Sequence, residues 1–519
     1  MLPPFQNEPL SDFSNPQQEA AFRAALERVK AEIGRTYPLV IDNERIELSS
    51  TFPSRNPSRP AEVVASFADG DASHADAAVA AASRAFPAWA NVPPTERAAY
   101  LLRAAAEMRR RKHEFSATMV LEVGKSWVEA DADTSEAIDF LEYYARHALR
   151  IVNSSNLLTH SDGEQLGLYY IPLGVGAVIP PWNFPNAIPT GMLGSALVMG
   201  NTVVFKPAEQ SPWIAWKVSE LFWSQGLPPG VLNFLTGPGE TVGARMVDHP
   251  GTRFISFTGS RAVGCQIYER AAKVHPGQKW LKRAILEMGG KDGVVVDETA
   301  VLDAAAAGVV ASAFGFQGQK CSAASRAIFV DSVYEPLAER VVALASKLTV
   351  GVPDTGRHID MGPVVDADAM QKIMNYIELG TQEGKLLLGG TPIQTPEGGY
   401  FIPPTIFGDV APDARLAQEE IFGPVLALIR ARDYDDALMI ANNTDYGLTG
   451  GVFSNDRTRL ERARREFFVG NLYLNRKITG AMVGVNPFGG FNMSGTDSKA
   501  GGPDYLLLFS QAKSVTERL

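Results

Sequence analysis

GVGAVIPPWNFPNAIPTGMLGSALVMGNTVVFKP, at residues 174–207, is the stretch that decides the fold class of this chain. It predicts a strand in GVGAVIPP, a helix of small residues in NAIPTGMLGSALVMG and a second strand in NTVVFKP. The alternation continues to residue 273, with helices expected in SPWIAWKVSELFWSQG, ETVGARMVDHP and RAVGCQIYERAAK and strands in GVLNFLTG and RFISFTGS. Because strands and helices that alternate in this way form βαβ units, we predict an α/β protein with a doubly wound parallel sheet.

The flanking sequence predicts further regular structure on both sides of this sheet. Residues 17–34 and 72–148 are rich in alanine and have apolar residues three or four apart, which predicts helices. A second strand–helix alternation from about Val294 to Asn475 predicts a second α/β domain, with a boundary near Gly289–Gly290. The tail YLLLFSQAKSVT predicts a strand, which would be an exposed edge unless another subunit covered it.

The composition narrows the class of protein. The chain has 519 residues, of which 45% are hydrophobic and 20% are charged, enough for several globular domains. Its net charge of −10 argues against binding to nucleic acid. Cys265 and Cys321 cannot form a disulfide framework, and the seven scattered histidines predict no metal site. We therefore expect a soluble, cytoplasmic globular enzyme.

Neither a signal peptide nor a membrane span is expected. The first residues, MLPPFQNEPLSDF, lack the basic and apolar regions of a signal peptide. Leu166 to Phe205 contains no charged residue, but prolines and asparagines interrupt it, so no apolar run of about 18 residues remains. We interpret this part as a buried α/β segment.

Ligands of parallel α/β sheets bind beyond the carboxyl ends of the strands. The candidate site residues at these strand ends are Trp182, Asn183, Lys206, Glu209, Thr258, Gly259 and Ser260.

Two further residues are candidates for chemistry. A free cysteine is usually buried and inert, but Gly318 would let the backbone near Cys321 approach a ligand, and the small residues that follow Cys321 leave room around its sulfur. Glu287 ends a predicted strand and precedes two glycines, so its carboxylate either caps the next element or serves as a base. Cys265 lies inside a predicted helix, and we interpret it as structural.

A series of motifs resembles the NAD(P)-dependent aldehyde dehydrogenase superfamily. LEMGGKD at 286–292 and FGFQGQKCSA at 314–323 resemble its paired active-site signatures. The other matches, in chain order, are PWNFP at 181–185, FKPAEQSP at 205–212, FTGS with Gly264 at 257–264, EEIFGPV at 419–425, and PFGG with Ser494-Gly495 at 487–495. The resemblance extends from roughly residue 40 to the end of the chain.

The resemblance implies a domain organisation. It predicts a modified Rossmann domain that binds NAD, formed by residues 1–153 and 171–289. A catalytic α/β domain would follow at 290–486, and a small β oligomerisation arm would consist of 154–170 and 503–519.

The resemblance also implies a mechanism. The thiolate of Cys321 would attack the aldehyde to give a thiohemiacetal, from which hydride can leave. The side-chain amide of Asn183 and the backbone N–H of Cys321 would stabilise the oxyanion. Glu287 would then activate the water that hydrolyses the thioester.

The expected cofactor is NAD. TGSRAVG departs from the usual dinucleotide fingerprint but lies at a strand-to-helix turn, where a helix N-terminus favours an anion. The resemblance places Ser260 near the pyrophosphate, Lys206 and Glu209 on the adenosine ribose, and Glu420 and Phe422 on the nicotinamide half. The full set of implied cofactor residues is Pro181, Trp182, Lys206, Glu209, Gly259, Ser260, Gly264, Glu420 and Phe422. Glu209 would repel a 2′-phosphate, which favours NAD, although some relatives with this acid accept NADP.

The loop LNRKITGAMVGVNPFGGF at 474–491 resembles the substrate-anchoring loop of one branch of the superfamily, the L-glutamate γ-semialdehyde dehydrogenases. The resemblance implies that the backbone N–H groups of Gly480 and Ala481 bind the substrate α-carboxylate as an anion nest, with help from Ser322.

The rest of the substrate would contact three other side chains. Phe184 and Phe488 would pack on its aliphatic stem, and Glu136 would lie near its ammonium group. Asn486 departs from the pattern, because the branch more often has Gln before PFGG, and this bears on the local packing of the loop.

The implied activity is oxidation of L-glutamate 5-semialdehyde, in equilibrium with 1-pyrroline-5-carboxylate, to L-glutamate, the second step of proline degradation. One alternative is another semialdehyde dehydrogenase, such as one for succinate semialdehyde, which would be expected to place a basic residue in the carboxylate pocket. An inactive structural or binding homologue is a second alternative, but Cys321, Glu287 and Asn183 are all present. The implied partners are further copies of the chain, as dimers or assemblies of dimers, and a separate proline dehydrogenase that supplies the substrate.

Overall fold

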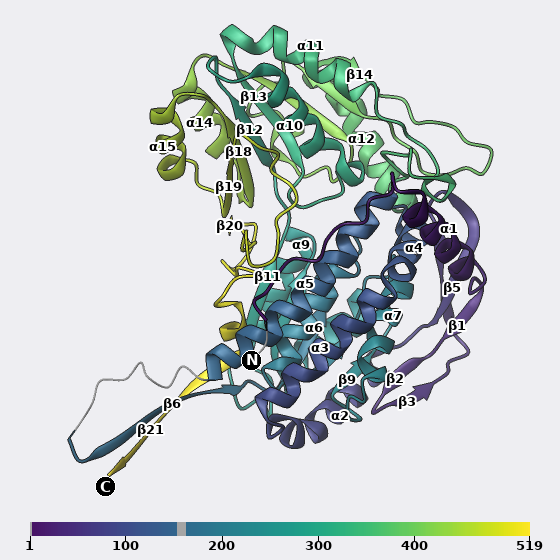
Figure 1. Ribbon diagram of the computed structural model, residues 1–519, viewed down its shortest axis with the longest axis vertical. Helices are drawn as coiled ribbons and strands as arrows, with labels where there is room; N and C mark the ends of the chain where they lie inside the picture. Colours follow the sequence, from purple (N-terminus) through teal and green to yellow (C-terminus); the bar gives the residue numbers. More distant parts are fainter. Residues whose placement is uncertain (1–2, 153–161, 519) are drawn as a thin grey trace.

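The computed structural model describes residues 3–152 and 162–518 (Figure 1). Its first large sheet has the strand order β11-β10-β7-β8-β9-β2-β3. The parallel strands of this sheet are β7 (Val175–Ile179), β8 (Thr202–Phe205), β9 (Leu232–Phe234), β10 (Thr252–Thr258) and β11 (Arg283–Glu287). The antiparallel strands at its edge are β2 (Leu39–Ile41) and β3 (Glu44–Ile46). The predicted parallel α/β sheet is confirmed.

The helices predicted before and within this first large sheet are present, but they are divided into more helices than the apolar spacing predicted. The helices that connect its strands are α6 (Ala187–Val198), α7 (Pro212–Ser224), α8 (Ala244–Asp248) and α9 (Arg261–Ala272). The N-terminal helices are α1 (Pro16–Lys30), α2 (Ala72–Ala90), α3 (Pro94–Arg110), α4 (Lys112–Val123) and α5 (Trp127–Val152). The segment ETVGARMVDHP forms a π-helical turn, Gly239–Gly243, before α8 begins.

The second α/β alternation forms another large sheet, with the order β14-β15-β16-β13-β12-β18-β19. Its strands are β12 (Asp292–Val296), β13 (Ala324–Val330), β14 (Lys385–Leu388), β15 (Thr405–Gly408), β16 (Val425–Ala431), β18 (Thr449–Phe453) and β19 (Asn471–Leu474). Its helices are α10 (Leu302–Phe314), α11 (Tyr334–Ala345), α12 (Ala367–Glu383), α13 (Arg415–Gln418), α14 (Tyr434–Asn442) and α15 (Arg457–Glu466). Apart from β14, which is antiparallel, neighbouring strands in this sheet run parallel.

Three small sheets complete the fold. Their strands are β1 (Arg35–Tyr37), β5 (Arg59–Ala68) and β4 (Thr51–Asn56) in one, β17 (Tyr446–Gly447) and β20 (Phe491–Asn492) in another, and β6 (Glu164–Pro172) and β21 (Ser510–Arg518) in the third. The antiparallel β6–β21 pair projects from the body of the molecule (Figure 1). The predicted arm includes residues 154–161, which lie outside the described residues, and its limits stay a prediction.

Two sequence-based expectations need correction. The first half of the tail, Tyr505–Phe509, is a buried 3₁₀ helix and not a strand, because its apolar rings pack on Tyr144 and Phe254 in the core. Only the polar second half forms a strand, and that strand pairs with β6 within the same chain. The uncharged segment is mostly buried from Leu173 onward, but its first residues belong to β6 and are partly exposed.

Among the helices in the two described ranges, none is long and apolar enough to cross a membrane.

Candidate active site

A strained turn positions Cys321. The turn Gly315–Gly318 follows α10, and its residues Phe316 and Gln317 have left-handed φ angles of 47° and 55°. Gln317 is held there because its side-chain amide donates to the carbonyls of Gly124 (3.2 Å) and Pro363 (2.7 Å). Strain of this kind persists only where surrounding contacts determine it, and it is concentrated at functional sites.

Gly318 could not be another residue. Its φ is +67°, and a Cβ there would lie 2.3 Å from the carbonyl oxygen of Gly423. The close approach at Gly318 is therefore to protein backbone, whereas the sequence predicted an approach to a ligand. The turn leaves the Cys321 side chain half-buried, three residues before β13 begins.

Asn183 lies against the same turn. It follows β7, its side chain is buried, and its Nδ2 donates to the carbonyl oxygen of Gln319 at 3.0 Å. The loop after β7 is fixed in turn from α5, because Asp133 accepts a hydrogen bond of 2.7 Å from the backbone N–H of Ala187. The structure therefore brings the Asn183 amide to the segment that carries Cys321.

Glu287, at the end of β11, is the buried acid of this site. Its Oε1 accepts a hydrogen bond from the hydroxyl of Ser498, while its Oε2 has no hydrogen-bond partner among the described residues. Burial raises the pKa of Glu287 to about 8, although Ser498 and the ammonium of Lys499 oppose the rise. A carboxyl group with a free oxygen and a raised pKa is suited to exchange protons near neutral pH.

The thiol of Cys321 is electrostatically coupled to nearby acids. Burial raises the pKa of the thiol, and the charges of Asp292, Glu420 and Glu287 raise it further. These surroundings disfavour the thiolate, so the thiol must lose its proton to a base before it can attack a carbonyl.

Lys206 and Glu209 follow β8, as predicted. Lys206 is buried and its Nζ lies 2.8 Å from Oε1 of Glu209, whose side chain is 42% exposed. Ser260 caps the N-terminus of α9 and accepts from the N–H of Val263 at 3.3 Å. An exposed carboxylate, a lysine and a helix N-terminus are suitable for a ribose and a pyrophosphate.

Two glycines have structural roles. A Cβ on Gly264 would lie 2.4 Å from Sδ of Met288, so this glycine allows α9 to pack closely on the segment after β11. A Cβ on Gly289 would lie 2.2 Å from both carboxylate oxygens of Glu420. The glycine pair after Glu287 therefore makes room for Glu420, whose Oε1 accepts from the N–H of Gly290 at 3.0 Å.

Aromatic rings lie beside Glu420. Phe422 has a left-handed φ of 61°, and its ring meets that of Trp182 edge to face, with centroids 5.5 Å apart. A small cavity adjoins them, lined among others by Gly290, Gly318, Lys320, Glu420 and Phe422. This hollow lies between the Cys321 turn and Glu420.

The predicted substrate side includes several charges that sequence analysis missed. Lys125 and Asp133 form a fully buried ion pair of 2.8 Å, and Nζ of Lys125 lies 4.2 Å from the ring centroid of Phe184. Lys320, next to Cys321, pairs with Glu129 at 2.7 Å. Among these charged residues, only Lys320 has a local signal, because it stands directly before Cys321.

Glu136 lies on α5, and burial raises its pKa to about 8, with the charge of Asp133 adding to the rise. A cation that bound beside it would lower this pKa and restore its charge.

The loop at 474–491 has two backbone amides without an acceptor among the described residues. Gly480 has a φ of +79°, and the N–H groups of Gly480 and Ala481 donate to no acceptor within the described residues. Asn486 closes the loop, since its N–H donates to the carbonyl of Met482 at 2.8 Å and its Oδ1 accepts from the N–H of Met482 at 3.4 Å. Asn486, which stands where the branch more often has Gln, therefore closes the loop with its own hydrogen bonds.

Two predicted substrate residues, Ser322 and Phe488, have backbone contacts within the chain. Ser322 is buried, and its carbonyl accepts from the hydroxyl of Thr449 at 3.3 Å. Phe488 is held by backbone pairing with Ala500. Cys265 is exposed on α9 and is not part of the assembly around Cys321.

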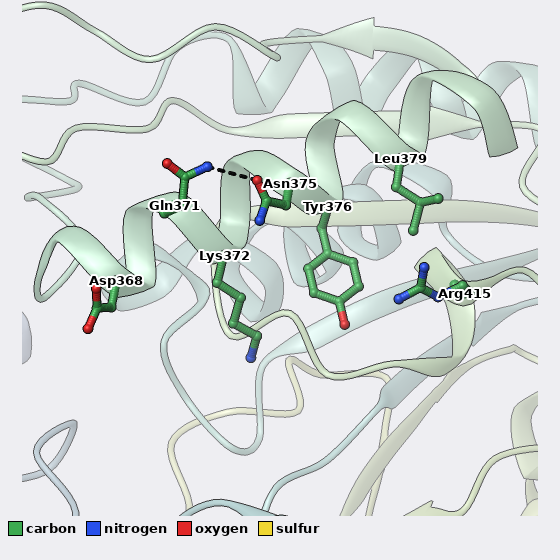
Figure 2. Close-up of a pocket in the computed structure, with 7 residues that line it drawn as sticks. All are labelled: Asp368, Gln371, Lys372, Asn375, Tyr376, Leu379 and Arg415. Carbon is green, nitrogen blue, oxygen red and sulfur yellow. Dashed lines mark hydrogen bonds between the residues drawn. The ribbon is translucent and has the colours of Figure 1, made fainter.

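A larger cavity lies on α12 (Figure 2). It measures about 460 Å³, and its lining residues are Asp368, Gln371, Lys372, Asn375, Tyr376, Leu379 and Arg415. The only hydrogen bond drawn between these residues joins Gln371 and Asn375. Burial raises the pKa of Glu420, and the charge of Lys372, which lines this cavity, opposes the rise. The cavity therefore lies near one of the predicted cofactor residues.

The aldehyde dehydrogenase family model matches residues 46–515, and the chain belongs to this family. It is 57% identical over 517 residues to 1-pyrroline-5-carboxylate dehydrogenase of Geobacillus kaustophilus and 53% identical to 1-pyrroline-5-carboxylate dehydrogenase 2 of Bacillus subtilis. Each match covers 100% of both chains.

Solved structures agree with these matches. The crystal structure of 1-pyrroline-5-carboxylate dehydrogenase from Thermus with bound NAD has a TM-score of 0.98 at 54% identity and covers 100% of both chains. Proline utilization A from Bdellovibrio bacteriovorus has a TM-score of 0.97 at 48% identity, over 99% of this chain and 53% of that one. The predicted family and fold are confirmed.

Proposed function

We propose that this protein oxidises L-glutamate 5-semialdehyde, formed by ring opening of 1-pyrroline-5-carboxylate, to L-glutamate with NAD, the second step of proline degradation. The observation that carries the proposal is the full-length similarity to 1-pyrroline-5-carboxylate dehydrogenases. The amides of Gly480 and Ala481, which have no acceptor among the described residues, and the half-buried Glu136 support it, because they offer one site for a carboxylate and one for an ammonium group. Succinate semialdehyde has no ammonium group and would leave Glu136 without a partner.

The chain's own residues account for the covalent steps. Cys321 loses its proton and adds to the aldehyde carbon, and the oxyanion accepts hydrogen bonds from Nδ2 of Asn183 and the N–H of Cys321. Bound NAD would supply the hydride acceptor. Glu287 then takes a proton from water, which attacks the thioester and releases the acid from sulfur.

The residues proposed to hold NAD are those whose geometry fits it. Lys206 and Glu209 would bind the adenosine ribose, the N-terminus of α9 at Ser260 would face the pyrophosphate, and Glu420 and Phe422 would hold the nicotinamide half. The exposed carboxylate of Glu209 favours NAD over NADP, since a 2′-phosphate would meet a like charge.

Changing Glu287 to Gln is expected to separate the two half-reactions. The amide cannot accept a proton, so thioester hydrolysis slows and a burst of NADH, one per site, precedes slow turnover. Stopped-flow absorbance checks the burst, and intact-mass spectrometry should find an acyl adduct on Cys321. Absence of both burst and adduct would assign Glu287 to an earlier step or to structure.

The parent enzyme supplies the control for this variant. Only the carboxylate form of Glu287 can act as a base, and its pKa is raised to about 8. Hydrolysis-limited turnover should therefore increase as pH rises through about 8, and this increase should disappear in the Gln variant.

The proposed reaction is tested by its product. Equilibrated 1-pyrroline-5-carboxylate and NAD should give equal amounts of NADH and L-glutamate, measured by absorbance and by chromatography of the amino acid. NADH without L-glutamate would contradict the substrate assignment but leave the family assignment intact.

The proposed partners are further copies of this chain and a proline dehydrogenase. The β6–β21 arm exposes Tyr169, Ile171 and Val515, apolar side chains that a second copy would cover. A proline dehydrogenase would supply the substrate in the cytoplasm.

A further inference from the structure

The segment before α1 lies along α5 and is bound to it at several points. In Figure 1 its dark purple trace runs between α5 and the yellow C-terminal loops. The backbone N–H of Ser11 donates to Asp131 at 2.7 Å, and that of Glu8 donates to Oδ1 of Asp139 at 2.6 Å. The carboxylate of Glu8 also pairs with Arg109 at 2.7 Å. These contacts order the segment beside the predicted substrate site.

Asn7 joins this segment to two other elements at once. Its Nδ2 donates to Oδ2 of Asp139 at 2.8 Å and to the carbonyl oxygen of Val483 at 3.0 Å. Asp139 belongs to α5, whereas Val483 belongs to the loop at 474–491, and both are buried. A side-chain amide nitrogen has two hydrogens, and here each serves a different element.

Phe5 adds an apolar contact at the same place. Its ring meets that of Tyr143 on α5 edge to face, with centroids 5.2 Å apart. Gly484 of the loop lies against both rings, since a Cβ there would be 2.9 Å from Tyr143 and 3.1 Å from Phe5. The loop, the segment and α5 are therefore packed together next to the Asn7 hydrogen bonds.

The two elements that Asn7 joins carry the proposed partners of the two charged groups of the substrate. Glu136, for the ammonium group, precedes Asp139 by one turn of α5. Gly480 and Ala481, for the carboxylate, precede Val483 in the loop. Both charged groups are bonded to one carbon, so their partners must be held at a fixed separation for the aldehyde end to reach Cys321.

We propose that Asn7 is a positioning residue for substrate specificity, which sets the spacing between α5 and the loop at 474–491 and so selects aldehydes with an α-amino acid head group. The inference rests on the proposed function. It assigns a role in substrate selection to a residue more than 300 positions from Cys321 in sequence.

Asn7→Ala tests the proposal, because it removes both donors and leaves the backbone in place. We expect KM for glutamate semialdehyde to rise about tenfold with kcat changed less than about twofold, as for lost ground-state binding. The kcat/KM for butyraldehyde, which has no head group, should stay within about twofold of the parent. The inhibition constant of L-glutamate, which has the same head group, should rise in parallel with KM.

Gln6→Ala is the matched control. Gln6 is the exposed neighbour in the same segment, and its side chain has no hydrogen bond in the described part of the chain, so all constants should match the parent. Partial misfolding of Asn7→Ala would lower kcat for both aldehydes and leave KM unchanged. Thermal melting and NAD titration on the same preparations check this directly.

Two outcomes with Asn7→Ala would overturn the role of Asn7. One is an unchanged ratio of the KM for glutamate semialdehyde to the KM for butyraldehyde. The other is an equal loss of kcat/KM for both aldehydes. A parent enzyme that does not prefer glutamate semialdehyde to butyraldehyde would instead contradict the proposed function. That failure is seen without any variant, so the two failures are distinguishable.

Discussion

Replacing Cys321 with serine is expected to abolish NADH formation, with kcat reduced by at least about a thousandfold, while NAD still binds. The surroundings of Cys321 are unfavourable for an anion, because burial and the charges of Asp292, Glu420 and Glu287 raise the pKa even of the thiol. A hydroxyl group is far harder to ionise than a thiol, so serine at this position would lack a usable nucleophile. Steady-state absorbance at saturating NAD measures the loss, and fluorescence titration measures NAD binding.

Cys265 supplies the control for this experiment. It is the other cysteine of the chain, exposed on α9 and separate from the Cys321 turn. Cys265→Ser should keep the parent activity. Turnover in Cys321→Ser above a few per cent of the parent would contradict the thiohemiacetal mechanism.

Gly480→Val is expected to lower kcat/KM for glutamate semialdehyde at least about a hundredfold and to leave the Kd for NAD unchanged. There is space for a side chain, since the nearest atom to an added Cβ would be Cε of Lys477 at 3.6 Å. The backbone is the obstacle, because a φ of +79° is strained for a β-branched residue. The loop would rearrange, and the amides of Gly480 and Ala481 would no longer face the carboxylate together.

Gly398→Val is the control for Gly480→Val. It separates the loss of carboxylate binding from the loss of stability that any valine with a left-handed backbone conformation causes. Gly398 has a φ of +71°, is exposed and has no atom within 4 Å of an added Cβ. It should lose a similar amount of stability with no change in kcat/KM. Equal losses of kcat/KM in both variants would remove the special role of Gly480.

Much of the fold could be predicted because its signals are local. The alternation from Gly174 to Lys273 depends on short apolar strands and on helices between turn residues, and the structure has them in that order. The strand prediction for the tail was wrong at YLLLF, because a short apolar run of this kind is compatible with several conformations. Contacts of Tyr505 with Tyr144 and of Phe509 with Phe254 decide its conformation, and these partners are remote in sequence.

The residues of the candidate site also differ in how far the sequence could predict them. Cys321, Glu287 and Asn183 stand in recognisable motifs, whereas the side chains that hold or surround them pair over long distances in the chain. Ser498 and Glu287 are 211 residues apart, and Lys320 and Glu129 are 191 apart. No local pattern indicates such pairs, because a single Ser or Lys is compatible with a solvated surface.

The most direct test of the account is the kcat/KM of the parent enzyme for glutamate semialdehyde, succinate semialdehyde and butyraldehyde under one set of conditions. A site built for polar groups rejects analogues that lack them, because its amides and its acid would be left unpaired. We therefore predict that glutamate semialdehyde exceeds butyraldehyde by about 10⁴, with succinate semialdehyde between them. Butyraldehyde within tenfold of glutamate semialdehyde would contradict the assigned substrate and leave only the family assignment.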